Sequence, residues 1–323
     1  MANDILFGTG WRPDPPDDHD LTLGHKEIIE LLRGTGLPDA ILGKPFRPAS
    51  SVDLRKWCSP VQFQGYYNTC TAHVVAGMVE LLENKAYGAY VAASRLFLYQ
   101  VARRILGEEG DPGVYLRQMM GAVAMLGAPP EKFWPYLDTS RKDDPRLNAA
   151  PDAFVYAMAR KYGGVRYFRL DVGGERGRAA NAPPLLRKLL PGPPGVLQRI
   201  KACLSTSHPS SIGFSLYKSS LERAAKTGDV PMPHEDEPPV GSHAVLIVGY
   251  DDERAIGGDG APETKGAFLF KNSWGADWGE KGYGWLPYAY LENDLAQDSW
   301  AMSGTHWVET DAFQLGLETP ATG

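Results

Sequence analysis

The sequence predicts an α+β fold of two lobes, with helices in the first half of the chain and short strands in the second. Apolar residues recur at helical spacing between residues 71 and 126, whereas β-type runs bounded by Gly, Pro and Asp follow residue 195. The chain has 323 residues, which is enough for two lobes. Its 36 glycines and 26 prolines predict long loops and argue against a helical bundle.

The helical elements come first along the chain. A short amphipathic helix is predicted over residues 25–33. A longer helix begins at Thr71, and two more are predicted over 94–106 and 114–126. Apolar residues on one face of the long helix indicate that this face is buried. They are Ala72, Val75, Ala76, Val79 and Leu82.

The second half of the chain is typical of a β-rich lobe. Strands are predicted over 211–217, 244–250 and 267–271, each short and bounded by turn-forming residues. Residues 251–266 are polar and rich in glycine, and they are predicted to form an exposed hairpin between the last two strands.

These elements divide the chain into an N-terminal arm over residues 1–50, a folded unit over 51–315 and a short tail over 316–323. Within the unit, the helical lobe is expected over about 57–165 and the β-rich lobe over about 195–315. Residues 12–20 of the arm are rich in Pro and Asp and should be extended.

Composition excludes several classes of protein. Hydrophobic residues make up 43% and charged residues 22% of the chain, as in ordinary globular proteins. The net charge of −6 gives no electrostatic reason to expect nucleic acid as a partner. No apolar stretch is long enough for a membrane helix, so no membrane partner is expected either. The start of the chain lacks an export signal, which predicts a cytoplasmic location and leaves non-classical secretion open.

Cys70 is a candidate nucleophile because it lies where a loop gives way to the long helix. The positive end of the helix dipole favours the thiolate, which is the reactive form. The simpler interpretation is a buried structural cysteine, since cysteine is often buried without a chemical role. The other two cysteines, Cys58 and Cys203, are too few for a disulfide framework.

Two further elements supply partners for such a thiol. His243 lies at the start of an apolar strand, and an imidazole can take the thiol proton and return it to a leaving amine. Asn272 lies in a segment rich in Trp and Gly, and its amide can orient one imidazole nitrogen. Taken singly, each has a structural reading: a lone histidine at a strand end, and a tryptophan-packed turn.

Taken together, these elements resemble the papain-like (C1) cysteine peptidases, prokaryotic branch. Gln64 lies six residues before Cys70, within the stretch PVQFQG. The strand from His243 and the stretch NSWGADWGEKGY from Asn272 match the family's His and Asn segments in the same order. The resemblance covers about residues 50–305.

The resemblance implies a papain-like two-lobe fold, with a helical left lobe, a β-barrel-like right lobe and the active site between them. It implies Cys70 as the nucleophile, His243 as the acid and base, and Asn272 as the residue that orients His243. It also implies that Gln64 contributes to the oxyanion hole. The reaction is hydrolysis of a peptide bond through an acyl-thioester, with no cofactor and no metal, by an endopeptidase acting on peptide or protein substrates.

By the same resemblance, Gly113 is the glycine that pairs with the substrate backbone. The specificity subsite is expected near small residues, which leave room for an apolar side chain: Ser211, Gly213, Ser242 and Ala244. Trp274 is expected to shield the contact between Asn272 and His243 from water.

The chain also departs from the family pattern. Thr71 and Tyr67 replace a tryptophan and a cysteine that the family often has, so the usual disulfides are largely absent. Cys58 and Cys203 are then expected to be structural thiols, with a bridge between them left open. His73 follows Cys70 on the same helix and is an alternative base, although its side chain should point away from the cleft.

Alternatives remain open for both the arm and the function. The arm over residues 1–50 braces the lobes, is removed as a pro-segment, or lies across the cleft and interacts with it. The alternatives to a peptidase are a catalytically silent papain-fold protein that binds peptides, and a thiol-dependent acyl transferase or amidase.

Overall fold

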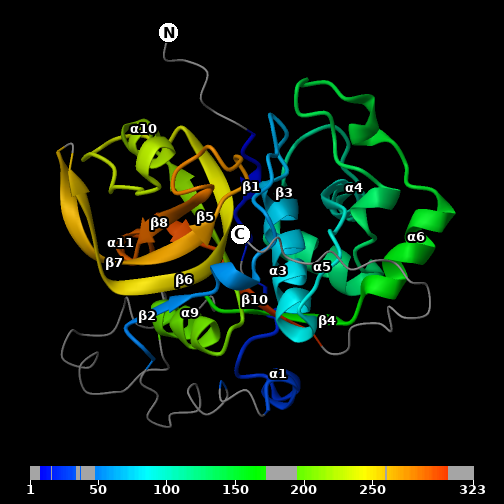
Figure 1. Cartoon of the computed structure of the whole chain (residues 1–323), viewed down its shortest axis with the longest axis horizontal. Helices are drawn as coiled ribbons and strands as arrows, with labels where there is room; N and C mark the ends of the chain where they lie inside the picture. The colour runs from blue at the N-terminus through cyan, green and yellow to red at the C-terminus, as the bar shows by residue number, and fades with distance from the viewer. Residues whose placement is uncertain are drawn as a thin grey trace.

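The computed structural model describes residues 8–15, 17–33, 37, 48–171, 195–258 and 260–304. A helical lobe and a sheet lobe stand side by side, and strand β1 (Trp11–Arg12) lies between them (Figure 1). The tail over 316–323 and residues 305–315 of the predicted unit lie outside the described residues.

The helical lobe is built around the long helix α3. Its α-helices are α3 (Cys70–Tyr87), α4 (Arg95–Leu106), α5 (Leu116–Leu126) and α6 (Ala153–Ala159). Short 3-10 helices lie at Arg55–Trp57, Glu131–Phe133, Pro145–Asn148 and Arg160–Tyr162. Helix α4 begins where the Ser94 side chain accepts a hydrogen bond from the Phe97 backbone at 3.2 Å. It ends at Gly107, whose φ of 70° suits a residue without a β-carbon.

The sheet lobe contains one antiparallel sheet in the order β4, β10, β5, β6, β7, β8. Strands β2 and β9 pair with β6 and β5 beside this path. The strands are β2 (Ser51–Asp53), β4 (Val165–Arg169), β5 (Ser210–Leu216), β6 (Gly241–Gly258), β7 (Ala261–Lys271), β8 (Tyr283–Pro287), β9 (Ala296–Gln297) and β10 (Trp300–Gly304). The same lobe also contains helices α9 (Val196–Ser205), α10 (Lys218–Thr227) and α11 (Ala289–Glu292).

The predicted two-lobe α+β fold is confirmed, and the sheet of its β-rich lobe is open. Among the described residues, the sheet has two ends, β4 and β8, and does not close. The extra strands β2 and β9 branch from the middle of the sheet, so they do not join its ends. The mixed helical and β-rich architecture itself is confirmed, in the predicted order along the chain.

Most predicted elements lie within a few residues of their observed bounds. The short helix near the N-terminus is α1 (Lys26–Leu31). The polar insertion is a hairpin, because β6 and β7 continue through it with Ala255 opposite Lys265. The helix predicted from Val114 begins two residues later, since Val114 and Tyr115 form strand β3 and pair with β1. That pairing needs a partner strand that local sequence cannot reveal.

The lobes meet where α3 packs against β6. Apolar side chains of α3, such as Val75 and Val79, join the same buried core as Leu246 of β6. This contact brings the first residue of α3 close to the start of β6, so the two lobes place their polar groups at one interface. Among the described residues, no helix is both long and apolar enough to cross a membrane.

Candidate active site

Cys70 is the first residue of α3 and is completely buried as a free thiol. Burial raises the pKa of the thiol to about 12, although backbone hydrogen bonds from Ala244, Thr71 and Trp11 act against this rise. Burial therefore opposes the thiolate that the helix N-terminus favours. The helix N-terminus is present, but exclusion of water outweighs its effect.

His243 and Asn272 come together from neighbouring strands of the sheet lobe. His243 lies on β6, Asn272 follows β7, and His243 Nε2 is 2.9 Å from Asn272 Oδ1. The backbone N–H of Ser273 donates to the same oxygen at 2.8 Å and so holds the amide in place. Burial lowers the pKa of His243 to about 4, so the ring is neutral. His243 Nδ1 is buried and has no hydrogen-bond partner among the residues that the structure describes.

Trp274 covers this pair. Its ring stacks on the His243 ring, with 4.4 Å between centroids and 26° between planes. Trp278 meets Trp274 edge to face at 5.7 Å, and both indoles are buried. The aromatic stack keeps water away from the His243–Asn272 hydrogen bond, which strengthens that bond.

Gln64 presents its side-chain amide from the loop before α3. Gln64 Nε2 donates to the backbone oxygens of Tyr67 and Gly8, at 2.7 Å in each case. Its Oε1 accepts from Ser273 Oγ at 2.5 Å, so the amide orientation is fixed by both lobes. One donor of this amide is therefore aimed at a peptide carbonyl that belongs to the N-terminal arm.

The arm runs through the interface between the lobes as an extended peptide. The backbone N–H of Gly8 donates to the Gly65 oxygen at 3.0 Å, and Val114 donates to the Gly10 oxygen at 2.9 Å. Ser242 Oγ donates to the Trp11 oxygen at 2.7 Å. Strand β1 is parallel to β3, with Trp11 opposite Val114. The arm thus contacts loops of the helical lobe on one side and β6 on the other.

Gly113 is in close contact with the backbone of the arm at Gly10. Its φ is 77°, and a β-carbon at this position would lie 2.1 Å from the Gly10 oxygen. Only glycine accepts both the backbone conformation and the close approach of another chain. The residue predicted to meet a substrate backbone therefore meets the backbone of the arm in this structure.

The four small residues predicted around the specificity subsite differ in position. Gly213 of β5 faces the Trp11 ring, and a β-carbon there would lie 2.0 Å from that ring. Ser242 binds the Trp11 backbone, and Ala244 is buried beside Cys70. Ser211 is turned toward the protein interior, where its Oγ accepts from the Trp300 backbone at 3.2 Å.

Buried ion pairs anchor the arm beyond Trp11. Arg117 Nη2 lies 2.6 Å and Arg169 Nη1 3.0 Å from Asp20 Oδ2. The backbone N–H of Arg117 donates to Asp14 Oδ2 at 3.0 Å. Burial raises the pKa of Asp14 to about 6. Arg169 also binds Asp298 at 2.9 Å, and Asp298 in turn accepts a hydrogen bond from the Trp11 indole.

Trp11 and Asp298 are the residues that the sequence prediction missed as parts of the site. They are 287 positions apart, and Trp11 Nε1 donates to Asp298 Oδ2 at 2.9 Å. The sequence signal was weak in both cases. Trp11 is a large aromatic residue in a polar arm, and Asp298 is a charged residue beside the apolar run of β10.

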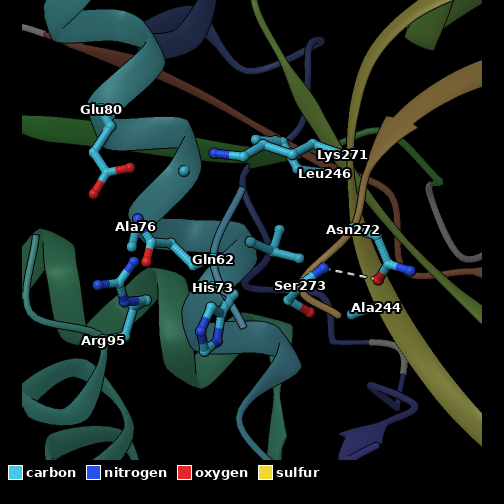
Figure 2. Close-up of a pocket in the computed structure, with 12 residues that line it drawn as sticks. Gln62, His73, Ala76, Glu80, Arg95, Ala244, Leu246, Lys271, Asn272 and Ser273 are labelled. Atoms are coloured by element: carbon cyan, nitrogen blue, oxygen red, sulfur yellow. Dashed lines mark hydrogen bonds between the residues drawn. The ribbon is translucent and has the colours of Figure 1, made fainter. Parts of the chain in front are cut away.

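A small cavity lies behind the site, between α3 and the sheet (Figure 2). His73 lines it from α3, while Lys271, Asn272 and Ser273 line it from the sheet lobe. His73 is neutral, because burial lowers its pKa well below the usual value, and its Nδ1 is 3.0 Å from the Thr69 oxygen. In the part of the chain that the structure describes, no three His, Cys, Asp or Glu side chains gather as they would around a metal ion.

Comparisons with known proteins agree with this geometry. Residues 194–304 match the model of the papain family of cysteine proteases. The chain is 27% identical to an uncharacterized peptidase C1-like protein of Acanthamoeba polyphaga mimivirus, over 90% of this chain and 85% of that protein. It is also 27% identical to the thiol protease aleurain of Arabidopsis thaliana, over 70% of this chain but only 51% of aleurain.

A solved structure supports the same relationship. Xylellain, a cysteine protease from Xylella fastidiosa, superposes with a TM-score of 0.68 and 28% sequence identity. The match covers 93% of this chain and 97% of xylellain, so it includes both lobes.

Proposed function

Since the chain belongs to the papain family of cysteine peptidases, we propose that Cys70 is its nucleophile and that His243 moves the proton. The observation that carries this proposal is the peptide carbonyl of Gly8, held by Gln64 Nε2 at 2.7 Å in the interface where Cys70 lies. A site that binds a peptide carbonyl with a fixed donor can bind the oxyanion formed from one.

The proposed reaction has two halves. The Cys70 thiol gives its proton to His243, the sulfur attacks the scissile carbonyl carbon, and the oxyanion receives the Gln64 hydrogen bond. His243 then protonates the leaving amine, and a thioester remains on Cys70. Water attacks the thioester with His243 as base, which releases the acid and restores the thiol. Asn272 holds His243 Nε2, so Nδ1 is the nitrogen available for this transfer.

We further propose that residues 8–15 hold the enzyme in an inhibited state. The arm takes the Gln64 donor that the oxyanion would need, and its Gly10 carbonyl accepts from Val114 beside Gly113. It also shields Cys70 from water, which accounts for a thiol pKa of about 12 instead of a thiolate. Opening of the arm is expected to let water return, and the helix N-terminus then favours the thiolate.

The test uses the full-length chain and its Trp11→Ala variant, in which the arm loses its largest buried contact. Both are treated with iodoacetamide, and the modified cysteine is identified by peptide mass. We expect faster labelling of Cys70 in the variant than in the parent, together with hydrolysis of a fluorogenic peptide. The variant that also carries Cys70→Ala is the control. Labelling of Cys70 without any hydrolysis would contradict the peptidase assignment.

A further inference from the structure

Two loops of the helical lobe bind the backbone of the arm. The nucleophile loop, residues 64–69, precedes α3, and the glycine loop, residues 107–113, lies between α4 and β3. The Gly8 carbonyl of the arm accepts from Gln64 Nε2 at 2.7 Å, and the Gly10 carbonyl accepts from the first residue of β3 at 2.9 Å. A peptide can make both contacts only while the two loops keep their spacing.

The glycine loop is not held in place by its own backbone. Three of its seven residues are glycines with positive φ, namely Gly107, Gly110 and Gly113. Glycine has more conformational freedom than any other residue, so such a loop is ordered only by contacts with its neighbours. All three cysteines are free thiols, so no disulfide ties this loop to the nucleophile loop.

Asp111 belongs to the glycine loop and bonds across to the nucleophile loop. Its Oδ1 and Oδ2 accept from the Asn68 backbone N–H at 3.1 and 2.9 Å, and its backbone oxygen accepts from Asn68 Nδ2 at 2.7 Å. Because a carbonyl oxygen only accepts, this last bond fixes which way the Asn68 amide faces. Asn68 Oδ1 is left to face the arm, where it accepts from the Thr9 N–H at 3.1 Å.

Tyr99 of α4 connects the carboxylate to the end of the glycine loop. Its hydroxyl donates to Asp111 Oδ1 at 2.6 Å and accepts from the Gly113 N–H at 3.1 Å. Tyr99 is completely buried, and burial raises the pKa of the phenol, so the hydroxyl keeps the proton that it donates. The Gly113 N–H is therefore turned toward Tyr99, and the arm bonds to the N–H of Val114 instead.

We propose that Asp111 is a positioning residue, and that the clasp formed by Asn68, Asp111 and Tyr99 fixes the spacing of the two loops for a bound peptide. This proposal rests on the proposed peptidase function. A peptide that binds along both loops depends on their spacing, whereas a small reagent that reaches only Cys70 does not. Loss of the clasp therefore weakens the binding of the arm and of peptide substrates, and leaves the reactivity of the exposed thiol unchanged.

Tyr99→Phe removes the hydroxyl that joins Asp111 to Gly113 and keeps the ring. In the full-length chain with Trp11 intact, we expect iodoacetamide to label Cys70 about tenfold faster, because the hydrogen bonds between the arm and the loops weaken. In the Trp11→Ala chain, the same substitution should leave the labelling rate unchanged, since the reagent contacts neither loop. A general loosening of the protein would raise both rates.

Steady-state hydrolysis of a tripeptidyl coumarin amide by the Trp11→Ala chain tests the substrate side. Tyr99→Phe should raise KM by about tenfold and change kcat little, because the loops bind the substrate backbone equally before and during the reaction.

Asp111→Asn should act in the same direction as Tyr99→Phe. The NH₂ group of the asparagine would face the Asn68 N–H or the Tyr99 hydroxyl, which are both donors in the clasp. The double variant should lose little more than the more affected single variant, since both changes break the same chain of hydrogen bonds.

Tyr250→Phe is the matched control, with urea unfolding of each variant as the measure of stability. Tyr250 is also completely buried, and its hydroxyl donates to the Ala49 oxygen at 2.9 Å and lies 3.1 Å from Ser205 Oγ, away from both loops. It should lower stability and leave the labelling rates and KM unchanged. Equal effects of Tyr250→Phe and Tyr99→Phe on labelling or KM would overturn the proposal.

The two measurements separate the clasp from the peptidase function. If no chain hydrolyses peptides but the labelling rates follow the expected pattern, the clasp is supported and the peptidase function is refuted. If the Trp11→Ala chain hydrolyses peptides and Tyr99→Phe changes neither KM nor labelling, the peptidase function stands and the clasp is refuted.

Discussion

The proposed catalytic centre and the anchor of the arm lie side by side but are held together by different forces. The catalytic centre uses neutral groups: a hydrogen bond between His243 and Asn272, an amide at Gln64 and a stacked indole. The anchor uses buried charges, with Arg117 and Arg169 set among aspartates. Neutral groups fixed by neighbouring backbone stay in place when the arm leaves, whereas a charged anchor depends on all its partners. In the proposed enzyme, the catalytic groups are therefore in place before the arm leaves, and the electrostatics of the arm would control access to them.

The largest expected effect is a loss of activity without a loss of stability, because the substitution touches the catalytic centre and not the anchor. In the Trp11→Ala background, Cys70→Ala should reduce kcat by about 10³-fold or more, because no other group supplies the nucleophile. The free energy of unfolding should change little, since the anchor is untouched. Peptide hydrolysis and urea unfolding measure the two quantities. Retained cleavage would remove Cys70 from the reaction.

Gln64→Glu tests the oxyanion donor. The variant keeps an oxygen for Ser273 Oγ but loses the N–H groups that reach Gly8. In the Trp11→Ala background, kcat should fall by about 10²- to 10³-fold, with a much smaller change in KM. Steady-state kinetics would measure the changes in kcat and KM separately. A change confined to KM would mean that Gln64 binds substrate without stabilising the oxyanion.

Arg169→Met breaks the anchor and leaves the catalytic residues intact. Removal of one partner from a buried ion-pair network leaves the remaining charges buried and uncompensated. The free energy of unfolding should therefore fall by about 3 kcal/mol. Arg12→Met is the matched control, because its pair with Glu108 is partly exposed and should contribute about 1 kcal/mol or less. Urea titrations of both full-length variants check this. Equal losses would show that the buried anchor has no special role.

The smallest expected effect is a pH dependence of arm docking. Burial raises the pKa of Asp14 to about 6 and of Asp298 to about 7, so the docked state binds extra protons. Docking is then favoured at low pH and weakens as the pH rises through 6 to 7. Cys70 labelling in the parent chain, divided by the rate in Trp11→Ala, should increase a few-fold from pH 5 to 8. Asp14→Asn should flatten this ratio, and a ratio that falls with pH would contradict the expected sign.

Local patterns predicted the helices and strands because each depends on nearby residues. Helix α4 carries its own cap at Ser94 and its own stop at Gly107, and both are visible in the sequence. The open sheet was not predictable from these patterns, since closure depends on which distant edges meet. Strand β3 shows the same limit, because it forms only against β1, which lies about 100 positions earlier in the chain.

The sequence by itself determined which residues are proposed to carry the chemistry: a thiol before a helix, a histidine at a strand start and an asparagine among tryptophans. These signals are local, so order and spacing were enough to place them. Only the tertiary structure decided the protonation state of these residues. Cys70 and His243 are both buried in the interface between the lobes, and exclusion of water keeps both neutral. The pairing of Trp11 with Asp298 likewise joins two ends of the chain. Burial and long-range contact depend on the whole fold, and no short stretch of sequence encodes them.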